Sequence, residues 1–175
     1  MLATRVTVGI DPGKGGAVVG ICEVFHQSIP TIIRNLMPVL GTKRPEYDLS
    51  ELAAIFSGYE EMVDGKGELR FYIERQQAMP AKMGGGAANY GRGYAMGVLE
   101  GALSALVLRY EVVGARRWQK DMLADIPGDN TKVRAEIAAR RIFPHVDLKR
   151  TDRARKADSG VVDALLIAEW GRRRK

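Results

Sequence analysis

Residues 5–25 read RVTVGIDPGKGGAVVGICEVF and contain two β-branched runs on either side of a glycine-rich turn. Valine, isoleucine and threonine favour the pleated surface of a sheet, so we predict one strand over 5–10 and another over 17–25. The intervening Pro12-Gly13-Lys14-Gly15-Gly16 has the composition of a turn. The stretch therefore predicts a β-hairpin whose first strand ends at Asp11.

The rest of the chain alternates strand-like and helix-like segments. We expect a third strand between Pro30 and Leu40, a helix after the capping sequence Asp48-Leu49-Ser50-Glu51, strands over 69–73 and 111–113, and helices over 94–109, 115–124, 130–142 and 159–170. Residues 79–93 are rich in glycine and predict a loop. This order predicts an α/β fold with one mixed sheet, and 175 residues fit a single domain over 1–175.

Composition excludes several classes of protein. A single cysteine, Cys22, excludes a disulfide framework and a multi-cysteine zinc site. No apolar run reaches the roughly 18 residues of a membrane span, and Met1-Leu2-Ala3-Thr4 enters a strand without a secretory signal. We therefore expect a cytoplasmic protein with no membrane partner.

Positive charge is concentrated in the second part of the chain. Residues 109–175 contain 17 lysines and arginines against 10 acidic residues, whereas residues 1–108 contain 10 against 11. A one-sided basic field suits a polyanionic partner such as nucleic acid. The alternative is a solvated face with a basic tail over 172–175.

Three acidic residues stand in apolar segments. Asp11 ends the first strand, Glu74 ends the strand over 69–73, and Asp163 lies in the apolar helix over 161–168. The carboxyl ends of strands form the sites of open α/β sheets, and a buried carboxylate needs a partner for its charge. Each acid alone is explained by a cap or an arginine partner. Together they favour a divalent metal site.

Asp158 is the candidate for a fourth carboxylate. It lies five residues before Asp163, which places the two about 140° apart on one helix. They share a site only if Asp158 precedes the first helical turn, and Ser159-Gly160 favours Asp158 as the N-cap. The alternative is that same cap without a metal role.

A cluster of carboxylates suits hydrolysis of phosphodiesters by two Mg²⁺ ions about 3.5–4 Å apart, which activate water and stabilise the leaving oxygen. A protein nucleophile has less support, because Cys22 lies in the middle of an apolar strand. Residues 9–16 do not form a Walker loop, because Gly15 follows Lys14 and a strand follows the turn. An Asp-x-Gly hairpin also binds nucleotide phosphates in actin-like ATPases, but those proteins join two such domains.

Four motifs, in this order, resemble those of RuvC-type Holliday-junction resolvases of the ribonuclease H-like superfamily, and the phage-encoded branch in particular. They are Gly9-Ile10-Asp11-Pro12-Gly13, Tyr72-Ile73-Glu74-Arg75, Tyr90-Gly91-Arg92-Gly93-Tyr94 and Asp163-Ala164-Leu165-Leu166-Ile167-Ala168-Glu169. The resemblance implies a ribonuclease H-like mixed five-stranded sheet flanked by helices. It also implies a homodimer that binds a four-way DNA junction and uses two Mg²⁺ or Mn²⁺ ions per active site.

The resemblance implies that Asp11, Glu74, Asp158 and Asp163 are the catalytic metal ligands, with Asp11 shared by both ions. One position departs from the family. Many relatives carry the fourth acidic or histidine residue three positions before the helical aspartate, where this chain has Gly160. Asp158 is the only nearby substitute.

The resemblance also assigns a DNA-binding surface. The loop after Glu74 would probe the junction centre, with Met79, Met83 and Tyr90 as wedges between unstacked bases. The predicted phosphate-binding residues are Lys14, Arg75, Lys82, Arg92, Arg116, Arg117, Lys120, Lys132 and Arg134. We expect Trp118 to be a core anchor rather than a base-stacking platform. The small residues Gly97, Gly101, Ala102 and Ala105 mark either the dimer contact or packing on the sheet.

These observations predict an endonuclease that resolves four-way junctions by paired symmetric nicks and leaves 5′-phosphate and 3′-hydroxyl ends. One alternative is another ribonuclease H-like nuclease that acts on RNA–DNA hybrids or simple branched DNA. A second alternative is a junction-binding protein without catalysis.

Overall fold

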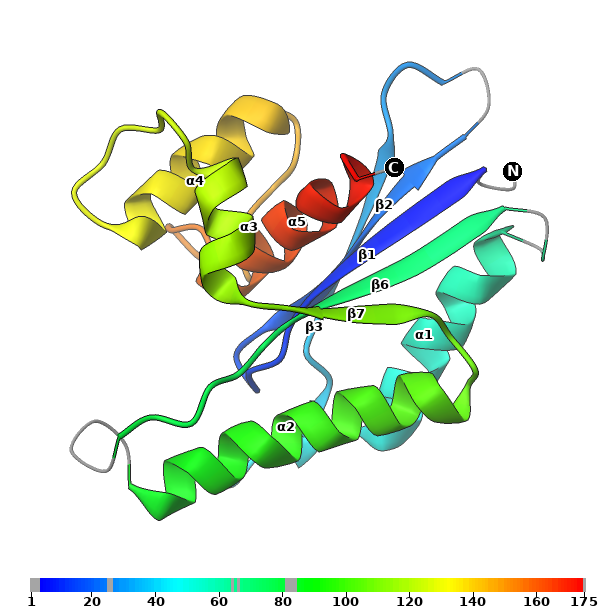
Figure 1. The fold of residues 1–175 in the computed structure, drawn as a ribbon, viewed down its shortest axis with the longest axis vertical. Coiled ribbons are helices and arrows are strands. Elements are labelled where there is room, and N and C mark those ends of the chain that lie inside the picture. The colour runs from blue at the N-terminus through cyan, green and yellow to red at the C-terminus, as the bar shows by residue number, and fades with distance from the viewer. Residues whose placement is uncertain (1–3, 25–26, 64, 66, 81–84, 175) are drawn as a thin grey trace.

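A computed structural model describes residues 4–24, 27–63, 65, 67–80 and 85–174. Its centre is a mixed sheet of five strands in the order β3-β2-β1-β6-β7 (Figure 1). The strands are β1 (Arg5–Asp11), β2 (Ala17–Glu23), β3 (Thr31–Leu36), β6 (Glu68–Glu74) and β7 (Tyr110–Val113). Strands β1, β2 and β3 pair antiparallel, whereas β6 and β7 run parallel to β1. The predicted hairpin and the mixed five-stranded sheet are confirmed.

Helices cover both faces of the sheet (Figure 1). They are α1 (Leu49–Val63) and α2 (Gly86–Ala105) on one face, and α3 (Ala115–Met122), α4 (Thr131–Ile142) and α5 (Ser159–Arg172) on the other. The alternation of side chains along a strand produces the two apolar layers. Val8 and Ile10 of β1 pack with α1 and α2, whereas Val19 and Ile21 of β2 pack with α5. No helix within the described ranges is both long and apolar enough to cross a membrane.

Helix α5 lies directly on the backbone of β1. A Cβ atom at Gly9 would overlap the carbonyl oxygen of Ala164 and the backbone nitrogen of Ala168, so only glycine permits this approach. Asp11 is two residues beyond Gly9, and side chains two apart point to the same face of a strand. The carboxylate of Asp11 therefore faces α5.

Helix α2 differs from the sequence prediction. We expected a loop over 79–93 and a helix over 94–109, but α2 begins at Gly86 and ends at Ala105. Glycine disfavours helix by about 1 kcal/mol per residue relative to alanine, which is why the glycines at its start predicted a loop. Burial of Ala95, Leu99 and Leu103 against the sheet stabilises the helix despite them.

The N-terminal caps agree with prediction. Oδ1 of Asn130 accepts a hydrogen bond from the Val133 backbone at 3.0 Å, and Oδ1 of Asp48 accepts one from Glu51 at 3.0 Å. A two-stranded pair of β4 (Val39–Leu40) and β5 (Glu46–Tyr47) was not predicted. Two-residue strands leave no period for a sequence to show.

Candidate active site

The three acids in apolar segments meet at one edge of the sheet. Ile10 of β1 is in register with Ile73 of β6, so Asp11 and Glu74 end two adjacent parallel strands. Tyr72, two residues before Glu74, packs in the layer formed with α5, which places the Glu74 side chain on that same face. Asp163 precedes Ala164, the α5 residue that contacts Gly9. The predicted juxtaposition of Asp11, Glu74 and Asp163 follows from these contacts.

The three carboxylates repel one another in a poorly solvated site. Burial raises the pKa of Asp11 to about 6, and the negative charge of Glu74 adds to this effect. Burial raises the pKa of Asp163 to about 7, with further contributions from Asp11 and Glu74, while Lys132 acts in the opposite direction. Burial also raises the pKa of Glu74. Glu74 thus contributes to the raised pKa of Asp11, and Asp11 and Glu74 both contribute to that of Asp163, so the three carboxylates lie near enough to interact electrostatically.

Trp118 of α3 positions Glu74. Its indole nitrogen donates a hydrogen bond to Oε1 of Glu74 at 3.1 Å, and its ring is completely buried. The prediction that Trp118 is a core residue is confirmed. Its contact with Glu74 joins residues that are 44 positions apart, which sequence analysis did not find.

Asp158 is the N-cap of α5, as predicted. Its Oδ1 accepts a hydrogen bond from the Val161 backbone at 3.1 Å, and its Oδ2 pairs with Nη1 of Arg150 at 3.1 Å. The negative charge of Asp158 makes the smallest contribution to the raised pKa values of Asp11 and Asp163. It therefore lies at the edge of the acidic group.

Gly160 occupies the position at which the resemblance of the sequence to RuvC-type resolvases led us to expect a fourth acidic or histidine residue. A Cβ atom here would lie 2.7 Å from the carbonyl oxygen of Gly15 and 2.7 Å from Cα of Gly16. Real Cβ atoms do not approach backbone so closely. The glycine-rich turn after β1 thus occupies the space that a side chain at position 160 would need.

The donor atoms of this site are of the kind that a hard divalent cation prefers, although they are not arranged around a single ion. In the part of the chain that the structure describes, no three acidic, histidine or cysteine side chains are arranged to hold one ion. Asp11, Glu74 and Asp163 nevertheless supply carboxylate oxygens, the ligands that Mg²⁺ and Mn²⁺ prefer. A divalent cation would also relieve the repulsion that raises their pKa values. The residues present therefore fit such an ion by charge and donor type.

Several of the predicted phosphate-binding residues lie around this edge. Lys132 of α4 and Asp163 line the same cavity of about 260 Å³. Arg75 follows Glu74 and is exposed, and Arg116 and Lys120 are exposed on α3. These side chains are free to approach a DNA backbone without rearrangement of the core.

Other predicted phosphate-binding residues already have partners. Arg117 pairs with Glu111 at 3.1 Å. Arg134 donates to the backbone carbonyls of Leu123 and Ile126, which holds the connection between α3 and α4. Lys82 lies outside the described residues.

Two of the predicted wedge residues are visible. Met79 is held by Asn89, whose side-chain amide bonds to the backbone nitrogen and the backbone oxygen of Met79, each at 2.9 Å. Tyr90 lies within α2 rather than in a loop and is 75% exposed. Met83 lies outside the described residues.

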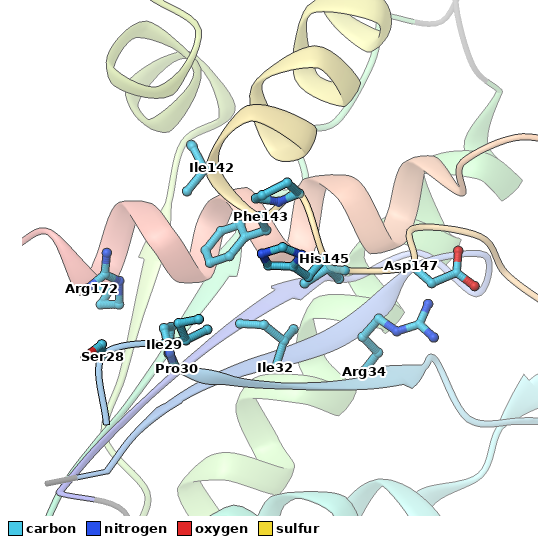
Figure 2. Close-up of a pocket in the computed structure, with 12 residues that line it drawn as sticks. Ser28, Ile29, Pro30, Ile32, Arg34, Ile142, Phe143, His145, Asp147 and Arg172 are labelled. Carbon is cyan, nitrogen blue, oxygen red and sulfur yellow. The ribbon is translucent and has the colours of Figure 1, made fainter. Parts of the chain in front are cut away.

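A cavity of about 570 Å³ lies away from the carboxylates, between β3 and the segment that follows α4 (Figure 2). Figure 2 shows Ile32 and Arg34 of β3 facing Phe143 and His145 across it, with Arg172 at one end. Arg172 pairs with Glu23, which is in register with the first residue of β1. The end of the cavity at Arg172 therefore lies at the opposite end of the strands from Asp11.

The fold matches known proteins in a comparison of structures but not in comparisons of sequence. No family model matches the sequence, and no curated protein matches it. A structure of RuvC from Thermus thermophilus aligns with a TM-score of 0.52 at 20% identity, covering 94% of this chain and 92% of that chain. Thermus thermophilus RuvC in complex with a Holliday junction substrate aligns with a TM-score of 0.51 at 17% identity, covering 95% and 91%.

The chain has a RuvC-type fold. The expectation that the resemblance raised about the architecture is thereby confirmed over almost the whole chain. Within this RuvC-type fold, the sheet edge that carries Asp11 and Glu74 and the helix that carries Asp163 form the one acidic group described above.

Proposed function

We propose that this chain is a metal-dependent, structure-selective endonuclease that resolves four-way DNA junctions. The observation that carries the proposal is the placement of Asp11 and Glu74 at the ends of adjacent parallel strands of a RuvC-type sheet, with Asp163 on the helix that packs against β1. Buried like charges destabilise a fold, so their presence at one place favours a functional role over a structural one.

The residues of the site have separate proposed roles in metal binding and in positioning. Asp11, Glu74 and Asp163 would hold Mg²⁺ or Mn²⁺, two ions per active site, with Asp158 contributing from the edge. Such ions supply Lewis acidity and an activated water for in-line attack on a phosphodiester. Trp118 fixes the direction of the Glu74 carboxylate. The products would carry 5′-phosphate and 3′-hydroxyl ends.

Two further features support junction DNA as the partner. The basic surface of α3 and α4 adjoins the carboxylates, and phosphate contacts of this kind supply affinity without reading sequence. Paired symmetric nicks need two active sites related by a two-fold axis, so the proposal includes a homodimer. Gly97 and Gly101 are exposed on α2 and would allow a second copy to approach closely.

The decisive test is Asp11→Asn assayed with Mg²⁺ on a four-way junction. This isosteric change removes a charged ligand and leaves the basic surface intact, so we expect cleavage to fall by about 100-fold or more while junction binding is retained. Glu60→Gln on α1 is the control, because Glu60 is exposed on the opposite layer. Undiminished cleavage by Asp11→Asn refutes the assignment.

The choice of substrate separates the alternatives. We expect the four-way junction to be cut about tenfold faster or more than an RNA–DNA hybrid or a linear duplex under the same conditions. Preference for the hybrid would identify a different ribonuclease H-like nuclease. Junction binding without cleavage of any substrate would identify a non-catalytic junction-binding protein.

A further inference from the structure

A second cavity lies next to the proposed catalytic edge. It measures about 320 Å³ and is lined by Pro12, Gly13, Lys14, Tyr47, Gln76, Ala88, Gly91, Arg92 and Ala95. Pro12 directly follows Asp11, so one wall of this cavity is attached to a proposed metal ligand. We call it the Tyr47 cavity. Its volume is near the lower end of the range of about 300–1,000 Å³ for small-molecule pockets, which suits one nucleotide and excludes a duplex.

The walls of the Tyr47 cavity suit a planar ligand. Tyr47 is 5% exposed, so only a small part of its ring faces the cavity, and its hydroxyl donates a hydrogen bond to the Pro12 carbonyl at 2.7 Å, which fixes the ring against the turn after β1. Helix α2 contributes three small residues to the lining, Ala88, Gly91 and Ala95, together with the longer side chain of Arg92. A nucleobase stacks on an aromatic ring with about 1–3 kcal/mol of favourable free energy.

Polar groups at the rim match a nucleotide. The Lys14 ammonium lies 5.8 Å from the centre of the Tyr47 ring and donates to the Pro45 carbonyl, and Arg92 donates to Oδ1 of Asn89 at 3.1 Å. Both cations are held by neutral acceptors, so their charge is available to a phosphate. The Gln76 amide carries both donors and an acceptor for the edge of a base.

An aromatic row leads from solvent to this cavity. The exposed ring of Tyr90 stacks on Tyr94, with centroids 6.2 Å apart and planes 10° apart. Tyr94 in turn lies 6.0 Å from Tyr47. The hydrogen bonds between Asn89 and the Met79 backbone connect α2 to the segment that follows Glu74 at the end of β6. Because Pro12 follows the end of β1, the cavity wall includes residues next to both strand ends.

From these contacts we infer that the Tyr47 cavity binds one unpaired nucleotide of the DNA strand whose phosphate lies at Asp11. The inference rests on the proposed function and adds to it a requirement for substrate with an unstacked base beside the cut. Extrusion of a nucleotide costs a few kcal/mol and costs least where pairing is already interrupted, as at a branch point. The cavity thus favours branched DNA over a continuous duplex.

A matched pair of α2 variants tests this inference. Gly91 lines the cavity and Gly93 does not, both are exposed, and a Cβ atom at either meets nothing within 4 Å. Gly91→Phe should fill the cavity, whereas Gly93→Phe adds the same side chain to the same helix outside it. Both variants are made in the Asp11→Asn chain so that the DNA stays intact. The probe is a four-way junction with 5-iodo-deoxyuridine beside the cleavage position.

We expect irradiation to cross-link the parent and Gly93→Phe to Tyr47, mapped by mass spectrometry. Gly91→Phe should lose this cross-link and bind the junction about tenfold more weakly, while both variants bind linear duplex equally. If Gly91→Phe does not unfold cooperatively, Arg92→Met replaces it, and its cross-link should fall about threefold or more because a phosphate partner is lost.

Equal cross-linking and junction affinity in Gly91→Phe and Gly93→Phe overturn the inference, as does a parent chain that gives no cross-link to Tyr47. Cleavage by the chain with native Asp11 is measured separately. A junction that is cut without a Tyr47 cross-link removes the nucleotide site and leaves the proposed function standing. A Tyr47 cross-link without any cleavage supports the nucleotide site and removes the proposed function.

Discussion

The indole nitrogen of Trp118 donates a hydrogen bond to Oε1 of Glu74 across 3.1 Å. Burial raises the pKa of Glu74, and this hydrogen bond opposes the rise because it stabilises the ionised carboxylate. Trp118 is therefore more than a core residue. It fixes the orientation and favours the charge of a carboxylate that ends a strand at the proposed active site.

Trp118→Phe should reduce junction cleavage about tenfold, because the ring volume is largely kept while Glu74 loses its donor. The pKa of Glu74 should rise further, so the pH at which activity is half-maximal moves upward. Single-turnover cleavage rates across pH 5.5–8.5 measure both effects. Trp170→Phe is the matched control, since Trp170 is also buried and donates to Asp121 at 2.7 Å, away from the carboxylates. Equal pH profiles for the two variants would remove the positioning role of Trp118.

The raised pKa of Asp163 predicts that the stability of the protein falls as the pH rises. Its pKa is raised to about 7 in the folded protein from 3.8, so between these values the folded state binds more protons than the unfolded state. The free energy of unfolding should therefore fall as pH rises from about 4 to about 7. Asp163→Asn should be more stable than the native chain at pH 8, by about 1–3 kcal/mol, and equally stable at pH 4. Urea unfolding at the two pH values measures the difference.

The effect of Mg²⁺ on the urea midpoint tests whether Asp163 helps to hold a metal ion. Added at pH 8, it should raise the urea midpoint of the native chain, because a ligand that binds only the folded state stabilises it. It should have a smaller effect on Asp163→Asn. Asp129→Asn, which alters an exposed acid before α4, should respond to Mg²⁺ as the native chain does. An equal response in all three chains would place any Mg²⁺ site elsewhere.

Gly160→Ala should destabilise the protein by about 1–3 kcal/mol, because the added methyl group meets the backbone of Gly15 and Gly16. Gly58→Ala in α1 is the control in open space, where the gain in helix propensity should stabilise by up to about 1 kcal/mol. Gly160→Asp, which adds a larger and charged side chain at the same place, should unfold at still lower urea. A native-like urea midpoint for Gly160→Ala would mean that the turn moves aside freely.

Periodicity and turn chemistry predicted most of this fold. The β-branched runs of β1 and β2, the apolar run that ends at Glu74 and the apolar helix α5 all lie where local sequence places them. The start of α2 was missed, because its stability comes from distant partners of Leu99 and Leu103 rather than from its own glycines. Local propensity gives no account of that packing.

The acidic site was predictable in composition but not in detail. Asp11, Glu74 and Asp163 stood out because a charge in an apolar segment needs an explanation. The support of Glu74 by Trp118 and the closure of position 160 by the turn after β1 depend on tertiary contacts between distant segments. No spacing in the sequence encodes them.

Asp158 combines a cap with a proposed ligand, and two substitutions separate these roles. Serine caps helices nearly as well as aspartate, whereas alanine costs about 1 kcal/mol at this position. Asp158→Ser should therefore keep native stability and Asp158→Ala should lose it, while both lose the carboxylate that pairs with Arg150. If the carboxylate helps to hold Mg²⁺, both variants should need about threefold more Mg²⁺ or higher for half-maximal cleavage. Because Asp158 lies at the edge of the acidic group, this shift should be smaller than that of Asp163→Asn. An unchanged Mg²⁺ requirement in Asp158→Ser would leave Asp158 as a cap alone and reduce the ligand set to Asp11, Glu74 and Asp163.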